Sequence, residues 1–222
     1  MYGGYKITVR IVLLFLLFTG VLHLNAQQKK YTLVLFRYVG NEGLSSLRPE
    51  ISIHKNILED LKSRNQVLLS GTLKENTGYF YLLNTGDKST ARAWFTEDTL
   101  IHKNNWKMEF RPFTMIYDKS CGEGIVGENS TDYTLILNYT YLTKFNIREA
   151  PLFHKEHENF INEIIKTGNV VLWGILDNTD GTIVLMKGTT DPAIFSLDPM
   201  VQSGFIEPET KDVIINSTLP CK

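Results

Sequence analysis

Two stretches of the sequence, HKNILEDLKSRNQVLLSG (54–71) and HENFINEIIKTGNVVLWG (157–174), share one pattern. Each begins at a histidine and ends at a glycine 17 positions later. In each, apolar residues follow the histidine at the third, fourth and seventh positions, which is the spacing of one helix face. Each then ends in a short apolar run typical of a buried strand. The sequence therefore predicts a helix followed by a strand, written twice.

A second spacing supports an internal duplication. Asp98 precedes Cys121 by 23 residues, and Asp198 precedes Cys221 by 23 residues. The flanking sequence predicts the same order in both halves: strand, helix, two strands joined as a hairpin, a second helix and a last strand. In the first half, the second helix is expected within residues 89–105. Shared order and shared spacing favour a repeat over chance.

The domain prediction follows from this repeat. Residues 27–120 form the first repeat, residues 121–132 a glycine-rich linker, and residues 133–222 the second repeat. A βαββαβ unit has the ferredoxin-like α+β arrangement, an antiparallel sheet with both helices on one face. The predicted strands carry apolar residues on both faces, so each sheet needs a partner. We therefore expect an α+β fold of two ferredoxin-like repeats packed face to face as an intrachain pseudo-dimer.

The N-terminus has the features of a secretory signal peptide. Lys6 and Arg10 precede a 14-residue apolar run, Ile11 to Leu24, with a small residue, Ala26, at the expected cleavage point. Residues 1–26 are therefore expected to be removed, which leaves a periplasmic or secreted chain without a membrane span. A retained anchor or a buried helix is the alternative.

Charge and cysteine content narrow the partners. The 222-residue chain has a formal net charge of −1 and no run of like charges, so it has no electrostatic surface for nucleic acid. Export favours a disulfide between Cys121 and Cys221, and two free buried thiols are the alternative. A further homo-oligomer is compatible with this composition.

The histidines that open the two stretches are the candidate catalytic residues. His54 and His157 lie on the apolar face of their helices, where an unpaired polar group is costly. Asp98 and Asp198 lie at matching places and could accept a hydrogen bond from each ring. Such a pair suits general acid–base chemistry near neutral pH. The alternative is a packing histidine held by a helix-capping aspartate. Rings that solvent can reach would favour catalysis, and rings sealed in the core would favour a non-catalytic ligand-binding or structural module.

Each half resembles the YCII-related proteins, a family of small ferredoxin-like chains that assemble as dimeric α+β barrels, and this resemblance implies such a barrel within the one chain. In the first half the matching residues are Arg48, His54, LLSGTL and FRPF (110–113); in the second they are Arg148, His157, LWGIL and DPMVQSG (198–204). Two departures stand out: Thr99 follows Asp98 where the family has proline, and the last strand of the second half lacks the RPF motif.

The resemblance implies a small-molecule enzyme with a histidine–aspartate dyad. Carried onto this sequence, the dyads are His54 with Asp98 and His157 with Asp198, and Arg48 and Arg148 would bind the ligand, an aromatic or lactone-like compound. No cofactor and no metal is expected. The cluster of His154, Glu156 and His157 in HKEH is the competing interpretation, a metal site, but its spacing differs from known zinc motifs.

Overall fold

The computed structural model describes residues 29–40, 48–74, 78–102, 106–119, 132–140, 148–177, 181–188 and 191–218. The predicted signal peptide, both cysteines and residues 121–131 of the predicted linker lie outside the described residues. None of the helices in the described residues is both long and apolar enough to span a membrane.

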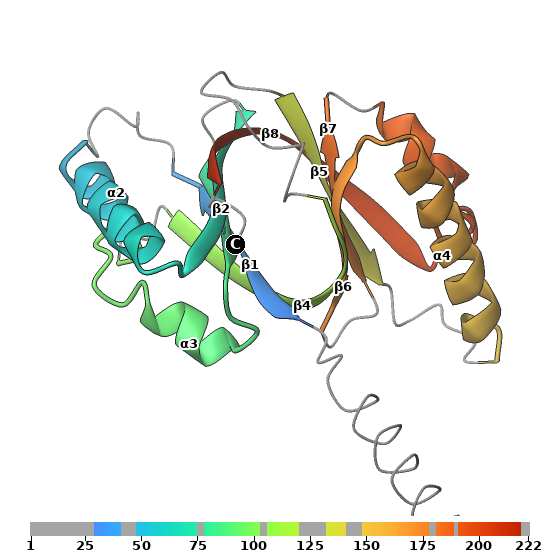
Figure 1. Ribbon diagram of the computed structural model, residues 1–222, viewed down its shortest axis with the longest axis horizontal. Coiled ribbons are helices and arrows are strands. Elements are labelled where there is room, and N and C mark those ends of the chain that lie inside the picture. Colours follow the sequence, from blue (N-terminus) through green and yellow to red (C-terminus); the bar gives the residue numbers. More distant parts are fainter. Residues whose placement is uncertain are drawn as a thin grey trace, which may run out of the picture.

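Eight strands and five helical segments alternate along the described residues (Figure 1). The first half contains β1 (Lys30–Tyr38), α2 (Arg48–Ser63), β2 (Val67–Leu73), β3 (Gly78–Leu83), α3 (Lys88–Ala93) and β4 (Trp106–Asp118). The second half contains β5 (Asp132–Thr140), α4 (Ala150–Lys166), β6 (Val170–Leu176), β7 (Thr182–Lys187), the 3₁₀ helix η5 (Pro192–Leu197), α5 (Pro199–Gln202) and β8 (Ile206–Thr218).

The strands close into a single antiparallel barrel with the order β1-β3-β2-β8-β5-β7-β6-β4. The predicted fold class, two ferredoxin-like βαββαβ repeats whose sheets face each other as a pseudo-dimer, is therefore wrong. The two halves do not stack sheet on sheet. They join edge to edge, because β2 pairs with β8 and β4 pairs with β6.

The long last strand of each half makes these joins. Residues 106–114 of β4 pair with β1, and residues 113–118 continue onto β6 of the other half. In the same way β8 pairs first with β5 and then, from Val213 onward, with β2. Closure is favourable because an open sheet would leave two edges of unpaired backbone N–H and C=O groups.

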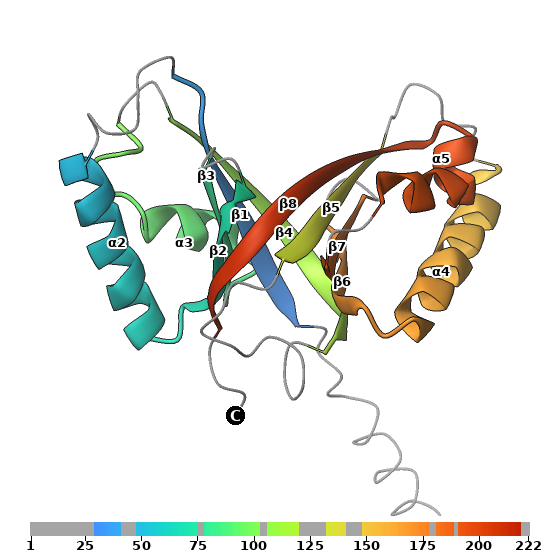
Figure 2. The same cartoon turned by 90° about the horizontal axis from the view of Figure 1, so that it is seen from above.

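The barrel wall separates an apolar interior from two apolar layers outside it. Its interior is filled by large side chains from all eight strands, including Leu35, Phe80, Phe113 and Leu135. Outside, α2 and α3 cover one side of the barrel, and α4, η5 and α5 cover the opposite side (Figure 2). The candidate histidines lie in these outer layers, between barrel and helix.

The glycines that end the two opening stretches have a packing role. A Cβ atom at Gly71 would lie 2.1 Å from the ring of Phe80, and one at Gly174 would lie 2.4 Å from the ring of Phe113. The backbone oxygens of Ile214 and Thr114 would lie 2.5 Å and 2.8 Å from the same two Cβ atoms. Both positions therefore need glycine, because an aromatic ring and a neighbouring strand both approach closely there.

The ends of the two long helices also correspond. Gly168 follows α4 with a φ of 80°, and Asn65 follows α2 with a φ of 57°. Glycine and asparagine are the residues that adopt this left-handed conformation most readily, and they end the helices at matching positions.

Candidate functional site

Each predicted histidine lies beside its predicted aspartate. His54 of α2 donates from Nδ1 to Oδ2 of Asp98 at 2.5 Å, and His157 of α4 donates from Nδ1 to Oδ2 of Asp198 at 2.5 Å. All four side chains are buried: His54 is 1% exposed, His157 is 4% exposed, and both aspartates are 0% exposed. The pairing is as expected, while its catalytic role stays a prediction.

Both aspartates are held in place by a local turn. Oδ1 of Asp98 accepts the backbone N–H of Leu100 at 3.0 Å, and Oδ1 of Asp198 accepts that of Met200 at 2.9 Å. Asp198 is thereby the N-cap of α5. In each aspartate, Oδ1 accepts a hydrogen bond from the backbone of the turn and Oδ2 accepts one from the imidazole. The aspartate therefore fixes the rotation of the imidazole and keeps the proton on Nδ1.

The other ring nitrogen distinguishes the two sites. Nε2 of His54 forms a hydrogen bond with the hydroxyl of Tyr81 in β3. Nε2 of His157 is buried and has no hydrogen-bond partner in the described part of the chain. A buried nitrogen without a partner is uncommon in folded proteins and is a candidate ligand contact.

This difference has a clear origin in the sequence. Val34 pairs with Tyr81 in the first half, and Ile136 pairs with Val184 in the second, so Val184 occupies the place of Tyr81. Because valine has no hydroxyl, Val184 cannot form a hydrogen bond with Nε2 of His157. Sequence reasoning did not identify Tyr81, because the partner of a strand residue depends on register.

Aromatic rings surround His54 as well. Phe36 stacks on the imidazole with a centroid distance of 5.0 Å, Tyr79 lies at 5.3 Å and Phe95 at 6.5 Å. Burial raises the pKa of Tyr81 well above its ordinary value, and the nearby Tyr79 and Asp98 add to this effect. The phenol therefore stays protonated and is a hydrogen-bond donor. The first site is closed and fully paired.

The second site has polar residues where the first has aromatic ones. Asn138 of β5 takes the place of Phe36, and Thr182 of β7 takes the place of Tyr79. Nδ2 of Asn138 donates to the hydroxyl of Thr182 at 2.6 Å, while Oδ1 is buried without a hydrogen-bond partner among the described residues. If the amide were turned around, its nitrogen would be the unpaired atom instead. Sequence reasoning did not identify Asn138 as part of this site, because only the strand register places it there.

The remaining predicted residues lie away from these pairs or outside the described part. The backbone of Arg48 begins α2, and its side chain lies outside the described residues. Arg148 is exposed, two residues before α4. His154 is half-buried on α4, and the described residues hold no group of three metal-binding side chains around it.

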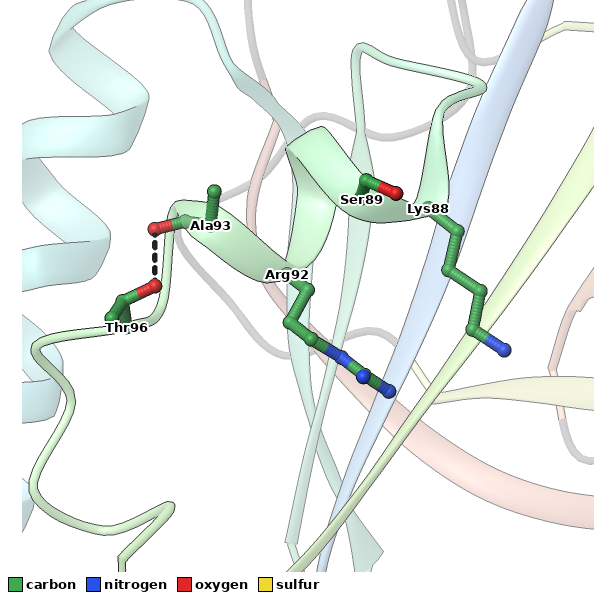
Figure 3. A pocket seen from close by; sticks show the side chains of 5 residues that line it. All are labelled: Lys88, Ser89, Arg92, Ala93 and Thr96. Carbon is green, nitrogen blue, oxygen red and sulfur yellow. Dashed lines mark hydrogen bonds between the residues drawn. The ribbon is translucent and has the colours of Figure 1, made fainter.

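A shallow depression lies elsewhere, against α3. It has a volume of about 390 Å³ and is lined by Lys88, Ser89, Arg92, Ala93 and Thr96 (Figure 3). All five residues are exposed, and the hydroxyl of Thr96 donates to the carbonyl of Ala93 at 3.0 Å. None of the four dyad residues lines this depression.

Comparison with known proteins gives similarity in fold. No protein-family model matches the chain, and no curated protein sequence does either. Among solved structures, a mutant chlorite dismutase from Candidatus Nitrospira defluvii in complex with cyanide has a TM-score of 0.54 at 10% identity, covering 86% of this chain and 92% of that one.

Two further structures agree. A monooxygenase-like protein from Fusobacterium nucleatum has a TM-score of 0.53 at 10% identity, covering 88% of this chain and 99% of that one. An anthrone oxidase-like protein has a TM-score of 0.52 at 10% identity, covering 87% and 94%. These neighbours have a dimeric α+β barrel-like architecture. The TM-scores show a shared fold. Sequence identities of 10% do not transfer an activity to this chain.

Proposed function

We propose that this protein binds a small organic molecule beside His157 and that His157 with Asp198 performs acid–base chemistry on it. The observation that carries the proposal is the buried, unpaired Nε2 of His157. Because Asp198 accepts the proton on Nδ1, Nε2 has a free lone pair. That atom can accept a hydrogen bond from a ligand hydroxyl or take its proton.

The first pair is not proposed to bind this ligand. Nε2 of His54 already bonds to Tyr81, and the ring lies among Phe36, Tyr79 and Phe95. A ligand would have to displace a paired, buried hydroxyl to reach it. The alternative of a packing histidine therefore suits His54 better than His157.

The residues at the positions of the second half that match the surroundings of His54 favour a polar but uncharged ligand. The unpaired amide atom of Asn138 and the hydroxyl of Thr182 are neutral groups, and they lie at the positions that pack against the ring in the first half. Phe195 and Trp173 belong to the apolar cluster of this layer. Neutral polar atoms in an apolar surrounding suit a carbonyl or a phenolic hydroxyl. An aromatic or lactone-like compound, the class implied by the resemblance to YCII-related proteins, meets this description.

A non-catalytic binding module is the second candidate, and one observation favours it. Both imidazoles are buried, with 1% and 4% exposure for His54 and His157. A ligand reaches His157 only if the covering segment, α4 with η5 and α5, moves. Sealed rings were expected to favour a non-catalytic module, so the burial of both rings supports this candidate, whereas the unpaired Nε2 of His157 supports proton transfer.

Nitrogen-15 NMR of the imidazoles tests the site directly. We expect His157 to show an Nδ1–H tautomer whose Nε2 is neither protonated nor hydrogen-bonded, while Nε2 of His54 shows the shift of a hydrogen-bond acceptor. Phenol and lactone fragments are expected to move the Nε2 signal of His157 and to leave that of His54 in place, because only the former is unpaired. The measurement is a series of long-range ¹H–¹⁵N spectra at increasing fragment concentration.

Matched variants complete this experiment. Asp198→Asn should change the tautomer of His157 and weaken fragment binding, whereas Asp98→Asn should change only the spectrum of His54. Fragments that shift His54, His102 and His157 equally would contradict the proposal.

Export is a separate proposal, which rests on the basic, apolar and small-residue order of residues 1–26. We propose cleavage after Ala26. Mass spectrometry of the full-length chain expressed in a secreting bacterial host should find a mature protein that begins at Gln27. An Ala26→Phe variant, which places a large side chain at the cleavage point, should retain the N-terminal segment. An uncleaved wild-type chain recovered from the cytosol would refute export.

A further inference from the structure

The first half holds a hydrogen-bonded series that the proposed function does not use. Asp98 accepts from Nδ1 of His54 at 2.5 Å, and Nε2 of His54 pairs with the hydroxyl of Tyr81. Tyr81 is 1% exposed. Its buried hydroxyl has a proton to donate, and Nε2 of the neutral ring can accept it because Nδ1 carries the ring proton. The hydroxyl of Tyr81 therefore donates to Nε2 of His54, and Nδ1 of the same ring donates to the carboxylate of Asp98.

A row of aromatic rings connects Tyr81 with a less buried part of the molecule. The ring of Tyr81 lies 6.3 Å from that of Tyr79, with 14° between their planes. Tyr79 lies 6.0 Å from Trp106 at 13°, and Trp106 lies 5.2 Å from Tyr38. Tyr38 and Tyr79 are partly exposed, while Tyr81 and Trp106 are buried. Tyrosine and tryptophan are the aromatic side chains most easily oxidised by one electron, and rings this close exchange electrons readily.

We propose that Tyr81 is a redox-active tyrosine whose oxidation is coupled to proton transfer to His54. A strong outer-sphere one-electron oxidant at the surface accepts the electron, which leaves Tyr81 by way of Tyr79, Trp106 and Tyr38. The O–H bond of Tyr81 breaks, and its proton forms an N–H bond at Nε2 of His54. The products are a neutral tyrosyl radical, an imidazolium paired with the Asp98 carboxylate, and the reduced oxidant.

The surroundings of Tyr81 support this coupling. Burial raises its pKa well above the ordinary value, so the phenol does not lose its proton to solvent before oxidation. An oxidised phenol that kept its proton would be a buried cation, which is costly in an apolar core. Transfer to His54 places the positive charge beside Asp98 instead. Phe36, stacked on the imidazole at 5.0 Å, adds a favourable cation–π contact to the imidazolium.

The second half provides an internal contrast. Val184, Thr182 and Asn138 stand where the first half has Tyr81, Tyr79 and Phe36, and Ile206 stands where it has Trp106. At these matching strand positions, the described part of the second half has no tyrosine or tryptophan, although Trp173 belongs to the same apolar layer. This inference does not depend on the proposed function, because it uses none of the residues of the second site.

Flash-quench oxidation followed by electron paramagnetic resonance tests the proposal. A ruthenium tris-bipyridyl complex with an electron-accepting quencher supplies the oxidant in light, and samples of the folded protein are frozen after the flash. We expect a neutral tyrosyl signal in the wild type and loss of most of it in Tyr81→Phe. Formation of the radical should be slower in D₂O, because a proton moves with the electron.

A second variant separates the electron path from the proton acceptor. Trp106→Phe leaves Tyr81, His54 and Asp98 unchanged and removes one oxidisable ring, so the radical should form more slowly at an unchanged position. Circular dichroism establishes that both variants are folded. If Tyr81→Phe fails to fold, the rates of the wild type in H₂O and D₂O and of Trp106→Phe decide the question. A signal that survives in Tyr81→Phe, or rates unaffected by both D₂O and Trp106→Phe, would overturn the proposal.

Discussion

Replacing Asp98 with alanine should lower the free energy of unfolding by about 3–5 kcal/mol. The carboxylate accepts the ring N–H of His54 and the backbone N–H of Leu100, and all of these groups are buried. Alanine leaves two donors unpaired inside the protein, and each costs about 1–3 kcal/mol. The measurement is urea-induced unfolding followed by fluorescence and circular dichroism, with the midpoint and slope compared between wild type and variant.

Asp98→Asn is the matched variant. Its Oδ1 can still accept from Leu100, and its amide can donate to Nδ1 of His54 if the ring proton moves to Nε2, where Tyr81 can accept it. We therefore expect a clearly smaller loss than for alanine. Asp87 caps α3 at the surface through Ser89 and Thr90, so Asp87→Ala controls for loss of a turn cap alone. A loss for Asp98→Ala no greater than for Asp87→Ala would show that the pair contributes nothing beyond its turn.

The candidate site was predictable to the extent that its residues share a local pattern. His54 and His157 face inward because apolar residues recur at helical spacing after each of them, and the sequence shows that directly. Asp98 and Asp198 were identified because the duplication repeats their position. Tyr81 and Asn138 were missed, because they act across strands and only the register brings them to the layer that holds the rings.

The sequence predicted the individual helices and strands, but it did not predict that the strands close into one barrel. The strands and both long helices occur in the predicted order, which followed from apolar runs for the strands and from helical spacing of apolar residues for the helices. The second helix of the first half is shorter than expected: α3 ends at Ala93, and the chain then turns so that Asp98 reaches His54.

Barrel closure depends on which strand edges pair, and the strands that close this barrel, β2 with β8 and β4 with β6, are far apart in the sequence. Apolar residues on both faces of a strand suit two packed sheets and suit a barrel covered by helices equally well. The distinguishing feature was length: β4 and β8 have 13 residues each, enough to pair with both halves. Sequence periodicity alone does not indicate the partner of such an extension.

The barrel interior gives the second large prediction, at Phe113. This ring is 0% exposed and belongs to the interior cluster, so Phe113→Ala should lower the free energy of unfolding by about 3–5 kcal/mol through lost burial and an unfilled cavity. Gly174→Ala should cost about 1–3 kcal/mol, because its new Cβ would overlap the same ring. Urea unfolding of both variants measures the two losses.

The two changes should not be additive. A Cβ at Gly174 would meet Cδ2 and Cε2 of Phe113 at 2.4 and 2.8 Å, and removing the ring removes both contacts. In the Phe113→Ala background, Gly174→Ala should therefore cost less than it does in the wild type, since of the three nearest atoms the carbonyl oxygen of Thr114, at 2.8 Å, remains. Gly71→Ala, which meets Phe80 instead, is the control and should cost the same in both backgrounds. Equal costs for Gly174→Ala with and without Phe113 would mean that the backbone, and not the ring, requires glycine at the point where the two halves join.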